Sequence, residues 1–177
     1  MRIKVHGIII ECLSGDIAAQ HDMDAVVNAA NAWLRPGGGV AGAIHRAAGP
    51  GLERECQPLA PIEPGQAVLT KGHNLPNRFV IHCLGPVYGR DEPASRLLCA
   101  CYRNALTRAE EAGVYSVAFP ALSTGAFGYP IEEAARIALQ TVIDATPRLD
   151  TVGHVRFVLH SPDDRELHER ILTELTG

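Results

Sequence analysis

Two loops rich in glycine and small polar residues are the segments of this sequence best suited to bind an anion. One contains three consecutive glycines, Gly37 to Gly39, and the other reads Ser123-Thr124-Gly125-Ala126-Phe127-Gly128-Tyr129. Glycine runs are costly to order and are typical of places where the backbone approaches a ligand closely or adopts a positive φ. The amides of a helix N-terminus and of a glycine nest attract anions, each contact contributing roughly 0.3 to 2 kcal/mol. The pattern predicts one diphosphate shared by both loops, and two tight turns are the alternative interpretation.

Two asparagines and one histidine near the first loop are further candidates. Asn28 and Asn31 are three residues apart at the expected end of a strand, and their amides both donate and accept hydrogen bonds. Alternatively, Asn28 ties down the glycine loop through backbone hydrogen bonds. His45 follows Ala41 by four residues, hence on the same helical face, and could receive a proton through a water if it points to the cleft. A lone helix histidine is more often structural.

Common nucleotide motifs fit this sequence poorly. The segment from Gly37 to Gly42 satisfies GxGxxG, but a Rossmann unit also needs a full crossover helix and an acidic residue about 20 positions on. Here the expected helix stops at Gly49, and Glu63 lies among prolines. Neither GxxxxGK[ST] nor HExxH occurs, so nicotinamide redox chemistry and ATP hydrolysis are disfavoured.

The number and spacing of the cysteines disfavour both disulfide bonds and a zinc site. They form an odd set without any CxxC pair, which disfavours a disulfide framework and a thiolate zinc site: Cys12, Cys56, Cys83, Cys99 and Cys101. We expect buried free thiols, and nothing in the sequence requires a metal or a cofactor.

Length and composition indicate one globular unit. A chain of 177 residues that is 46% hydrophobic buries about two-thirds of its unfolded surface, which predicts a single domain over residues 1–177 with one core. The net charge is -4 and no basic run could track a polyphosphate, so nucleic acid is an unlikely partner. Signal-peptide order and long apolar runs are both missing, which predicts a cytoplasmic protein without a membrane partner.

Hydrophobic periodicity and turn residues predict alternating strands and helices. Strands are expected over residues 3–5, 8–13, 25–28, 66–71, 78–84, 116–120 and 154–160. Helices are expected over 41–48, 52–59, 94–112 and 131–145, with a last helix at the C-terminus. This order predicts an α/β fold with a largely parallel sheet covered on both faces and an antiparallel contribution from the N-terminal segments. Ligands lie beyond the carboxyl ends of parallel strands, so both glycine loops are expected to face one crevice.

Helix-end residues support several of these boundaries. Gly113 is a natural residue to follow the helix over 94–112, and Pro130 suits the first position of the helix over 131–145. Asp163 and Glu166 form a possible capping box for the last helix, which is expected to bury three apolar side chains: Leu167, Ile171 and Leu175.

Five segments of the sequence, taken together, closely resemble the macrodomain family. They run in register over essentially the whole chain: Gly15-Asp16-Ile17, Asp24-Ala25-Val26-Val27-Asn28-Ala29-Ala30-Asn31, the stretch from Gly37 to Gly49, Val80-Ile81-His82-Cys83-Leu84-Gly85-Pro86, and the stretch from Pro120 to Pro130. The resemblance implies a three-layer α/β/α domain with a mixed, largely parallel central sheet. It also implies binding of ADP-ribose, whether free, on ADP-ribosylated proteins, or as O-acetyl-ADP-ribose.

The resemblance assigns roles to individual residues. Asp16 would accept the adenine amino group and the backbone of Ile17 would help to select that base, although an aspartate after glycine is also an ordinary turn residue. Asn31 would address the distal ribose, against which the Phe127 ring would pack, unless Phe127 serves the core. The implied ligand-binding set is Asp16, Ile17, Asn28, Asn31, Gly38, Gly39, Val40, Ser123, Thr124, Gly125, Ala126 and Phe127, and the candidate catalytic residues are Asn31, Asn28 and His45.

One departure from the family bears on catalysis. MacroD-type hydrolases resembling this chain usually carry an aspartate where Ala41 stands, and such a base typically contributes on the order of a hundredfold or more. Some viral macrodomains, notably coronaviral ones, also read Gly-Gly-Gly-Val-Ala-Gly and are hydrolases. In a mechanism without the aspartate, Asn31 fixes the ribose, loop amides hold a water, and a ligand phosphate takes the proton.

Three functions therefore follow as hypotheses. The first is a hydrolase of ADP-ribosyl esters, acting on O-acetyl-ADP-ribose or on carboxylate-linked protein adducts. The second is a reader that binds ADP-ribose without turnover, as Ala41 permits. The third, a nicotinamide-dependent oxidoreductase that uses the GxGxxG segment, predicts NAD binding with a spectral signal on reduction.

Overall fold

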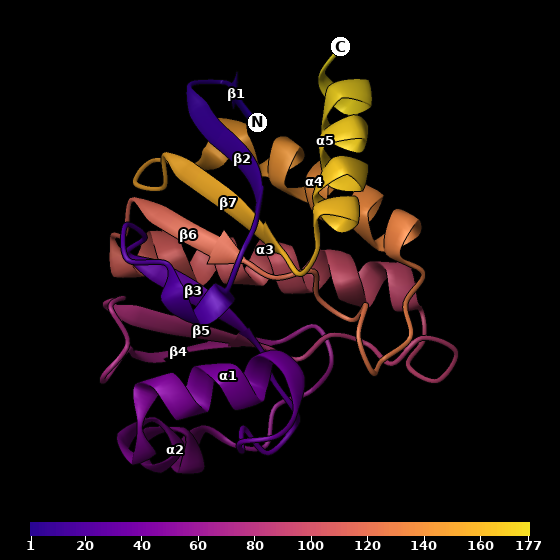
Figure 1. The fold of residues 1–177 in the computed structure, drawn as a ribbon. Helices are drawn as coiled ribbons and strands as arrows, with labels where there is room; N and C mark the ends of the chain where they lie inside the picture. The colour runs from indigo at the N-terminus through magenta and orange to yellow at the C-terminus, as the bar shows by residue number, and fades with distance from the viewer.

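The computed structural model describes all 177 residues and contains one seven-stranded sheet in the order β1-β2-β7-β6-β3-β5-β4 (Figure 1). The strands are β1 Arg2–Val5, β2 Ile8–Ser14, β3 Ala25–Ala29, β4 Ala67–Lys71, β5 Phe79–Cys83, β6 Ser116–Phe119 and β7 His154–Leu159. The five inner strands are parallel, whereas the edge strands β1 and β4 are antiparallel to their neighbours. The expected mixed, largely parallel sheet is confirmed, and β4 adds a second antiparallel edge at the end away from the N-terminus.

Helices cover both faces of the sheet and complete three α/β/α layers. The helices α1 Gly39–Ala48 and α2 Pro50–Cys56 lie on one face, at the bottom of Figure 1. The helices α3 Ala94–Ala112, α4 Ile131–Ala145 and α5 Pro162–Thr176 lie on the other. The three-layer class is therefore confirmed.

The sheet separates two hydrophobic clusters. Successive side chains of a strand point to opposite faces, so Val26 joins the cluster beneath α1 and α2 while Val27 joins the larger cluster beneath α3, α4 and α5. Val80 and Ile81 divide in the same way on β5. The expectation of one core is wrong, because a sheet covered on both faces has a core on each.

The topology also removes the Rossmann alternative. The helix after the glycine loop, α1, ends at Ala48 and is followed at once by α2. The next strand, β4, runs antiparallel to its only partner β5. The parallel strand, helix and strand unit that a dinucleotide site needs is therefore not formed here.

Helix starts differ from the sequence predictions at several points. Helix α1 begins at Gly39 instead of residue 41, and α2 begins at Pro50, so Gly49 alone separates the two helices. Pro130 precedes α4 as its N-cap, because its ψ of 127° is extended and not helical. Ser161 caps α5 in place of the expected Asp163 box.

The cap and the buried face of α5 have a local physical reason. The Ser161 hydroxyl accepts a hydrogen bond from the backbone N–H three residues on, at 3.1 Å, which moves Asp163 into the first turn, where its charge suits the helix dipole. Ile171 is buried as expected, but Leu167 and Leu175 are only half-buried. His168 and Leu172 fill the remaining buried positions.

All five cysteines are free, and four of them are buried. Burial raises the pKa of the Cys12 and Cys101 thiols to about 12, which makes these thiols inert near neutral pH. Cys99 on α3 is the partly exposed one. No group of three or more histidine, cysteine or acidic side chains is arranged to hold a metal ion.

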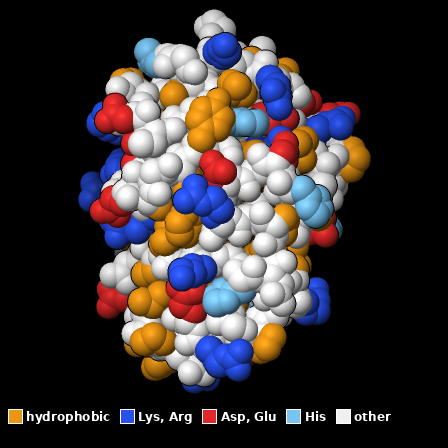
Figure 2. Space-filling view, turned by 90° about the vertical axis from the view of Figure 1, so that its left-hand side faces the viewer, with side chains coloured by type: hydrophobic (Ala, Val, Ile, Leu, Met, Phe, Trp, Pro, Cys, Tyr) orange, Lys and Arg blue, Asp and Glu red, His pale blue; other side chains and the backbone are white.

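The side of the molecule at the amino ends of the parallel strands faces the viewer in Figure 2, where basic and acidic side chains are interspersed.

None of the helices combines the length and the apolar character needed to span a bilayer. The loops that follow β3 and β6 lie at the carboxyl ends of the parallel strands, toward the right of Figure 1.

Candidate functional site

A cleft of about 360 Å³ lies at the carboxyl ends of β3, β5 and β6. The loops after these strands meet there, as the sequence predicts for a parallel sheet. The lining residues are Ala29, Ala30, Asn31, Gly37, Gly38, Gly39, Val40, Ala41, Gly85, Ala121, Leu122, Ser123, Gly125, Ala126 and Phe127. Both glycine loops therefore contribute to one site.

The N-terminus of α1 opens into this cleft without a side-chain cap. Gly38 is the N-cap, with extended φ and ψ of -86° and -179°, and no side chain accepts from the first turn. Gly39 continues at a φ of 56°, which favours glycine. Gly39, Val40 and Ala41 line the cleft, so the free amides and the positive end of the helix dipole lie beside it. The sequence predicts that an anion binds at such a helix start, and this geometry is compatible with that prediction.

Gly42 holds the glycine loop close to α1. A Cβ on Gly42 would lie 2.4 Å from the carbonyl oxygen of Gly37 and 3.0 Å from a guanidinium nitrogen of Arg46. Backbone at that distance cannot be displaced as easily as a side chain. Only glycine at position 42 therefore allows the loop to fold down beside the helix start.

Asn31 closes the turn that leads from β3 into the glycine loop. Its Oδ1 accepts from the backbone N–H of Arg35 at 3.0 Å, and its Nδ2 donates to the Arg35 carbonyl at 2.7 Å. Each amide atom keeps one further hydrogen-bonding position. These two bonds fix the orientation of the Asn31 amide, and Asn31 also lines the cleft, where a ligand could reach it.

The second loop places Ser123 under unusual constraint. Its φ is 68°, a left-handed value for a residue with a side chain, and its buried Oγ has no hydrogen-bond partner within the chain. A Cβ on Gly85 would lie 2.1 Å from that oxygen, so Gly85 is needed to seat it. Buried hydroxyls without a partner are uncommon, and Ser123 lines the cleft, so a ligand bound there is a candidate partner for this oxygen.

The other predicted residues of this loop divide between the cleft and the loop itself. Gly125, Ala126 and Phe127 line the cleft. Thr124 does not, because its Oγ1 donates to the Ala121 carbonyl at 2.8 Å. The half-buried Phe127 also packs against the cluster beneath α1, which confirms a core role for this ring, and its contact with a ligand stays a prediction.

The cleft contains no ionisable side chain. Its lining consists of small, apolar and amide or hydroxyl residues, and Ala41, 5% exposed, stands at the helix start. Protein groups here can donate hydrogen bonds and exclude water, but no carboxylate or imidazole of the lining can remove a proton.

Asn28 lies beneath the cleft and not in it. It is 1% exposed, and its Nδ2 lies 3.1 Å from Nδ1 of His82, a fully buried ring whose pKa is lowered by burial to about 3. The Nε2 of His82 in turn lies 2.9 Å from the Thr70 hydroxyl. Asn28 therefore does not tie down the glycine loop through backbone bonds, and any part it takes in catalysis would be indirect.

His45 does not line the cleft that Ala41 lines. It borders a separate hollow of about 350 Å³ on the other side of the glycine loop, together with Arg46 and Glu53. Burial lowers its pKa, and neither ring nitrogen has a partner within the chain. The four residues from Ala41 to His45 advance about 6 Å along the helix axis, which carries His45 past the cleft.

Asp16 and Ile17 follow β2 at the same edge of the sheet. Asp16 is the N-cap of the 3₁₀ helix Ile17–Ala19, and its Oδ1 accepts from Ala18 N at 2.9 Å. Asp16 is exposed and its second carboxylate oxygen makes no hydrogen bond within the chain. The turn-residue interpretation holds, and one oxygen remains for a ligand.

Sequence reasoning missed five cleft residues. They are small or apolar side chains at strand ends: Ala29, Ala30, Gly85, Ala121 and Leu122. Their side chains carry no chemistry, so residue type gave no signal. The rule that ligands lie beyond carboxyl strand ends would have found Gly85, which follows β5 within two residues.

Comparison with known proteins matches this architecture to one family. The family described as Macro domain matches residues 27–138. A macro domain-containing protein of Chlorobaculum tepidum is 43% identical over 93% of this chain and 96% of its own length. The ADP-ribose glycohydrolase MACROD2 of Xenopus laevis is 44% identical over 97% of this chain, which spans 42% of that relative.

Solved structures agree with the sequence relatives. The Oceanobacillus iheyensis macrodomain with ADP superposes with a TM-score of 0.95 at 40% identity, covering 99% of this chain and 96% of that one. A variant of the same protein with ADPR superposes equally well, at 39% identity, covering 99% and 98%. The fold, the paired glycine loops and these matches lead to one conclusion: the chain belongs to the macro domain family.

Proposed function

We propose that this chain binds ADP-ribose and hydrolyses ADP-ribosyl esters, either O-acetyl-ADP-ribose or mono-ADP-ribose on acidic side chains of proteins. The observation that carries the proposal is the uncapped N-terminus of α1, which lines the same cleft as Ser123, whose hydroxyl has no hydrogen-bond partner within the chain. The relatives support the ligand, since ADP and ADPR are bound to a structure with the same fold and one relative is named a glycohydrolase.

The distances along the sheet suit an elongated ligand. Asp16 follows β2 and Asn31 follows β3, and two strands, β7 and β6, lie between them. Three strand spacings amount to roughly 14 Å. Adenine at Asp16 and the distal ribose at Asn31 would leave the diphosphate between the two glycine loops, beside the positive end of α1.

Hydrolysis in this cleft would depend on positioning. Asn31 would hold the distal ribose, and the amides of the glycine loop would hold a water near the ester-bearing carbon. Since no side chain of the lining is ionisable, the ligand's own phosphate is the available acceptor for the proton of that water. Fixing the reactants in this way supplies a large share of many enzymatic rates.

A reader without turnover is the second candidate, and Ala41 favours it. A methyl group stands at the helix start where a carboxylate would have a clear route to activate water. Such a general base typically contributes on the order of a hundredfold or more. Binding would be retained, because the anion site is built from backbone.

The test compares release of ADP-ribose with binding. Purified protein is incubated with O-acetyl-ADP-ribose and with glutamate-linked mono-ADP-ribosylated protein, and released ADP-ribose is quantified while calorimetry measures ADP-ribose affinity. The variants are Asn31→Ala, Ala41→Asp and Asn104→Ala. Asn104 is the matched control, because its amide also bonds a backbone carbonyl, that of Gly65 at 2.8 Å, but neither residue lines the cleft.

The hydrolase proposal expects release well above the spontaneous rate, loss in Asn31→Ala and no change in Asn104→Ala. Binding without release, with release gained in Ala41→Asp, identifies a reader that lacks only the base. A protein that neither binds nor releases ADP-ribose contradicts both candidates.

A further inference from the structure

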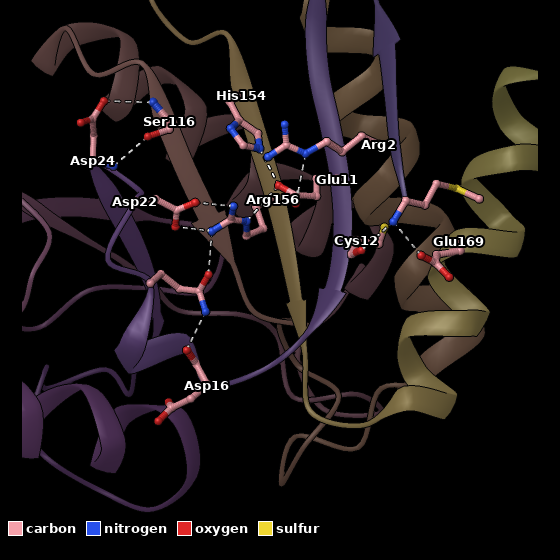
Figure 3. Close-up of polar contacts among 12 residues, drawn as sticks. Arg2, Glu11, Cys12, Asp16, Asp22, Asp24, Ser116, His154, Arg156 and Glu169 are labelled. Carbon is pink, nitrogen blue, oxygen red and sulfur yellow. Dashed lines mark hydrogen bonds and ion pairs between the residues drawn. The ribbon is translucent and has the colours of Figure 1, made fainter.

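A buried charged cluster connects the centre of the sheet to the segment that carries Asp16 (Figure 3). Its centre is Arg156 on β7, which is 5% exposed. Glu11 on the neighbouring β2 is 8% exposed and lies 2.7 Å from His154 Nε2. The cluster lies outside the cleft and takes no part in the chemistry proposed above.

The guanidinium of Arg156 makes four hydrogen bonds to three side chains. Nε donates to Glu11 at 3.0 Å, and the two terminal nitrogens donate to the two oxygens of Asp22 at 2.7 and 2.8 Å. Nη1 also donates to Oε1 of Gln20 at 2.9 Å. The bidentate bond lowers the pKa of Asp22 to about 2, so this pair stays charged over the physiological range.

Gln20 carries the connection from Arg156 to Asp16. Its Oε1 accepts from Arg156, and its Nε2 donates to the backbone carbonyl of Asp16 at 2.8 Å. The amide cannot rotate by half a turn without losing both bonds, because guanidinium only donates and a carbonyl only accepts. Gln20 is 7% exposed, so water does not readily replace either bond.

The segment after Gln20 is held independently. The side chain of Asn77 donates to the carbonyls of Gln20 and Met23, both at 2.7 Å. Residues 16–23 are thus held at the Asp16 end by Gln20, whose amide is fixed by Arg156, and at the Met23 end by Asn77. Such a turn presents the Asp16 carboxylate in one orientation before any ligand arrives.

We infer that Gln20 and Arg156 are positioning residues for recognition of a purine base, acting through the Asp16 carbonyl and the turn Ile17–Ala19. The inference rests on the proposed ADP-ribose binding and adds to it the origin of base selectivity. Buried ion pairs contribute little net stability but restrict conformation, and that restriction is what a directional bond to an exocyclic amino group requires.

The test measures base discrimination and not affinity alone. Calorimetry on the full chain gives the dissociation constants for ADP-ribose and for the analogue with hypoxanthine in place of adenine, which sets a carbonyl oxygen against the Asp16 carboxylate. A hydrogen bond to a charged group predicts a preference for adenine on the order of tenfold in the wild type. General damage to the cleft lowers both affinities and leaves their ratio unchanged.

Two variants interrupt the connection at Gln20. Gln20→Leu removes both bonds, whereas Gln20→Glu keeps an acceptor for Arg156 and places a second oxygen against the Asp16 carbonyl. Gln66→Leu is the matched control, because its Oε1 accepts one backbone bond, from Glu63 at 2.8 Å, in another loop. Thermal melts establish that each variant is folded.

We expect the adenine preference to fall to about twofold or less in both Gln20 variants and to persist in Gln66→Leu. Wild-type preference retained in a folded Gln20→Glu variant overturns the positioning role while leaving ADP-ribose binding intact. A wild type that binds both ligands equally also overturns it. Absence of ADP-ribose binding in the wild type overturns the proposed function itself, which distinguishes the two failures.

Discussion

Replacing Gly42 with alanine tests whether the glycine loop is held against α1 by contact. The added Cβ would lie 2.4 Å from the Gly37 carbonyl oxygen, and ordinary contact begins at 3.4 Å. The loop must therefore move away by 1.0 Å, or the helix must shift by as much. Arg46, at 3.0 Å, is the far end of a flexible side chain and can move aside.

Two opposing terms determine the stability of Gly42→Ala. Alanine is about 1 kcal/mol more favourable than glycine in a helix interior. Inserting a methyl group into a tight contact typically costs about 1–3 kcal/mol. The free energy of unfolding should therefore fall by no more than about 2 kcal/mol. Ligand affinity should suffer more, because losing one hydrogen bond from the loop to a charged phosphate costs about 1.5–3 kcal/mol, which is on the order of tenfold to a hundredfold in affinity.

Urea unfolding and calorimetry with ADP-ribose check both quantities. We expect at least a tenfold loss of affinity in a folded variant. Gly51→Ala in α2 is the control, since its Cβ would meet the His73 ring at 2.8 Å, a side chain that can rotate away from it. If Gly42→Ala binds ADP-ribose like the wild type and its free energy of unfolding rises by about 1 kcal/mol, the loop is not held by this contact and the reasoning fails.

Three further predictions concern single residues. Ser123→Ala removes a hydroxyl without an intramolecular partner, so ADP-ribose affinity should fall about fivefold to tenfold by calorimetry with little change in urea midpoint; a lowered midpoint would show a structural role. The pKa of His82 is lowered to about 3, so between its unfolded value near 6.5 and pH 3 the unfolded chain binds the extra proton. Stability should therefore decline as pH falls from 7 to 5, by up to about 1.4 kcal/mol per unit, and the decline should be shallower in His82→Gln. Trp33, the only tryptophan and 55% exposed, lies two residues after Asn31, so its fluorescence should change on ADP-ribose binding and Trp33→Phe should bind normally without that signal.

Local sequence signals predicted the elements well where a stereochemical requirement marked their ends. Helix α3 spans residues 94–112 as predicted, because Gly113 adopts the left-handed φ of 70° that ends it. The start of α5 was predicted two residues late, because Ser161, which caps the helix, precedes the expected cap Asp163 by two residues. The strand order could not be derived, since the placement of β3 between β6 and β5 depends on pairings distant in sequence.

The site was predictable in its backbone and less so in its side chains. Glycine and strand-end rules located both loops, whose lining role depends on main-chain geometry. Asn28 was harder to interpret because β3 extends one residue further than predicted, to Ala29. That leaves Asn28 within the strand, on the same face as Val26 and beneath α1. The position of His45 outside the cleft could not be predicted, because it depends on α1 leaving the cleft within one turn.

Whether this chain hydrolyses ADP-ribosyl esters or only binds ADP-ribose depends on whether a proton can be removed from a water in this cleft. Backbone amides and the Ser123 hydroxyl would stabilise the fully charged diphosphate of bound ADP-ribose more than a diphosphate that has accepted a proton from water. The positive end of α1 lowers the basicity of that phosphate while it raises affinity. A site that binds the diphosphate more tightly therefore makes this phosphate a weaker base, so proton removal becomes harder unless a carboxylate also accepts the proton. With Ala41 in place, we expect turnover to be limited by proton removal. Both phosphates of ADP-ribose are fully ionised near neutral pH, so the rate of release above the spontaneous one should stay constant between about pH 6 and 8 in the wild type, and Ala41→Asp should raise it on the order of a hundredfold. A wild-type rate that rises with pH through this range would show that a group titrating there, and not the phosphate, removes the proton.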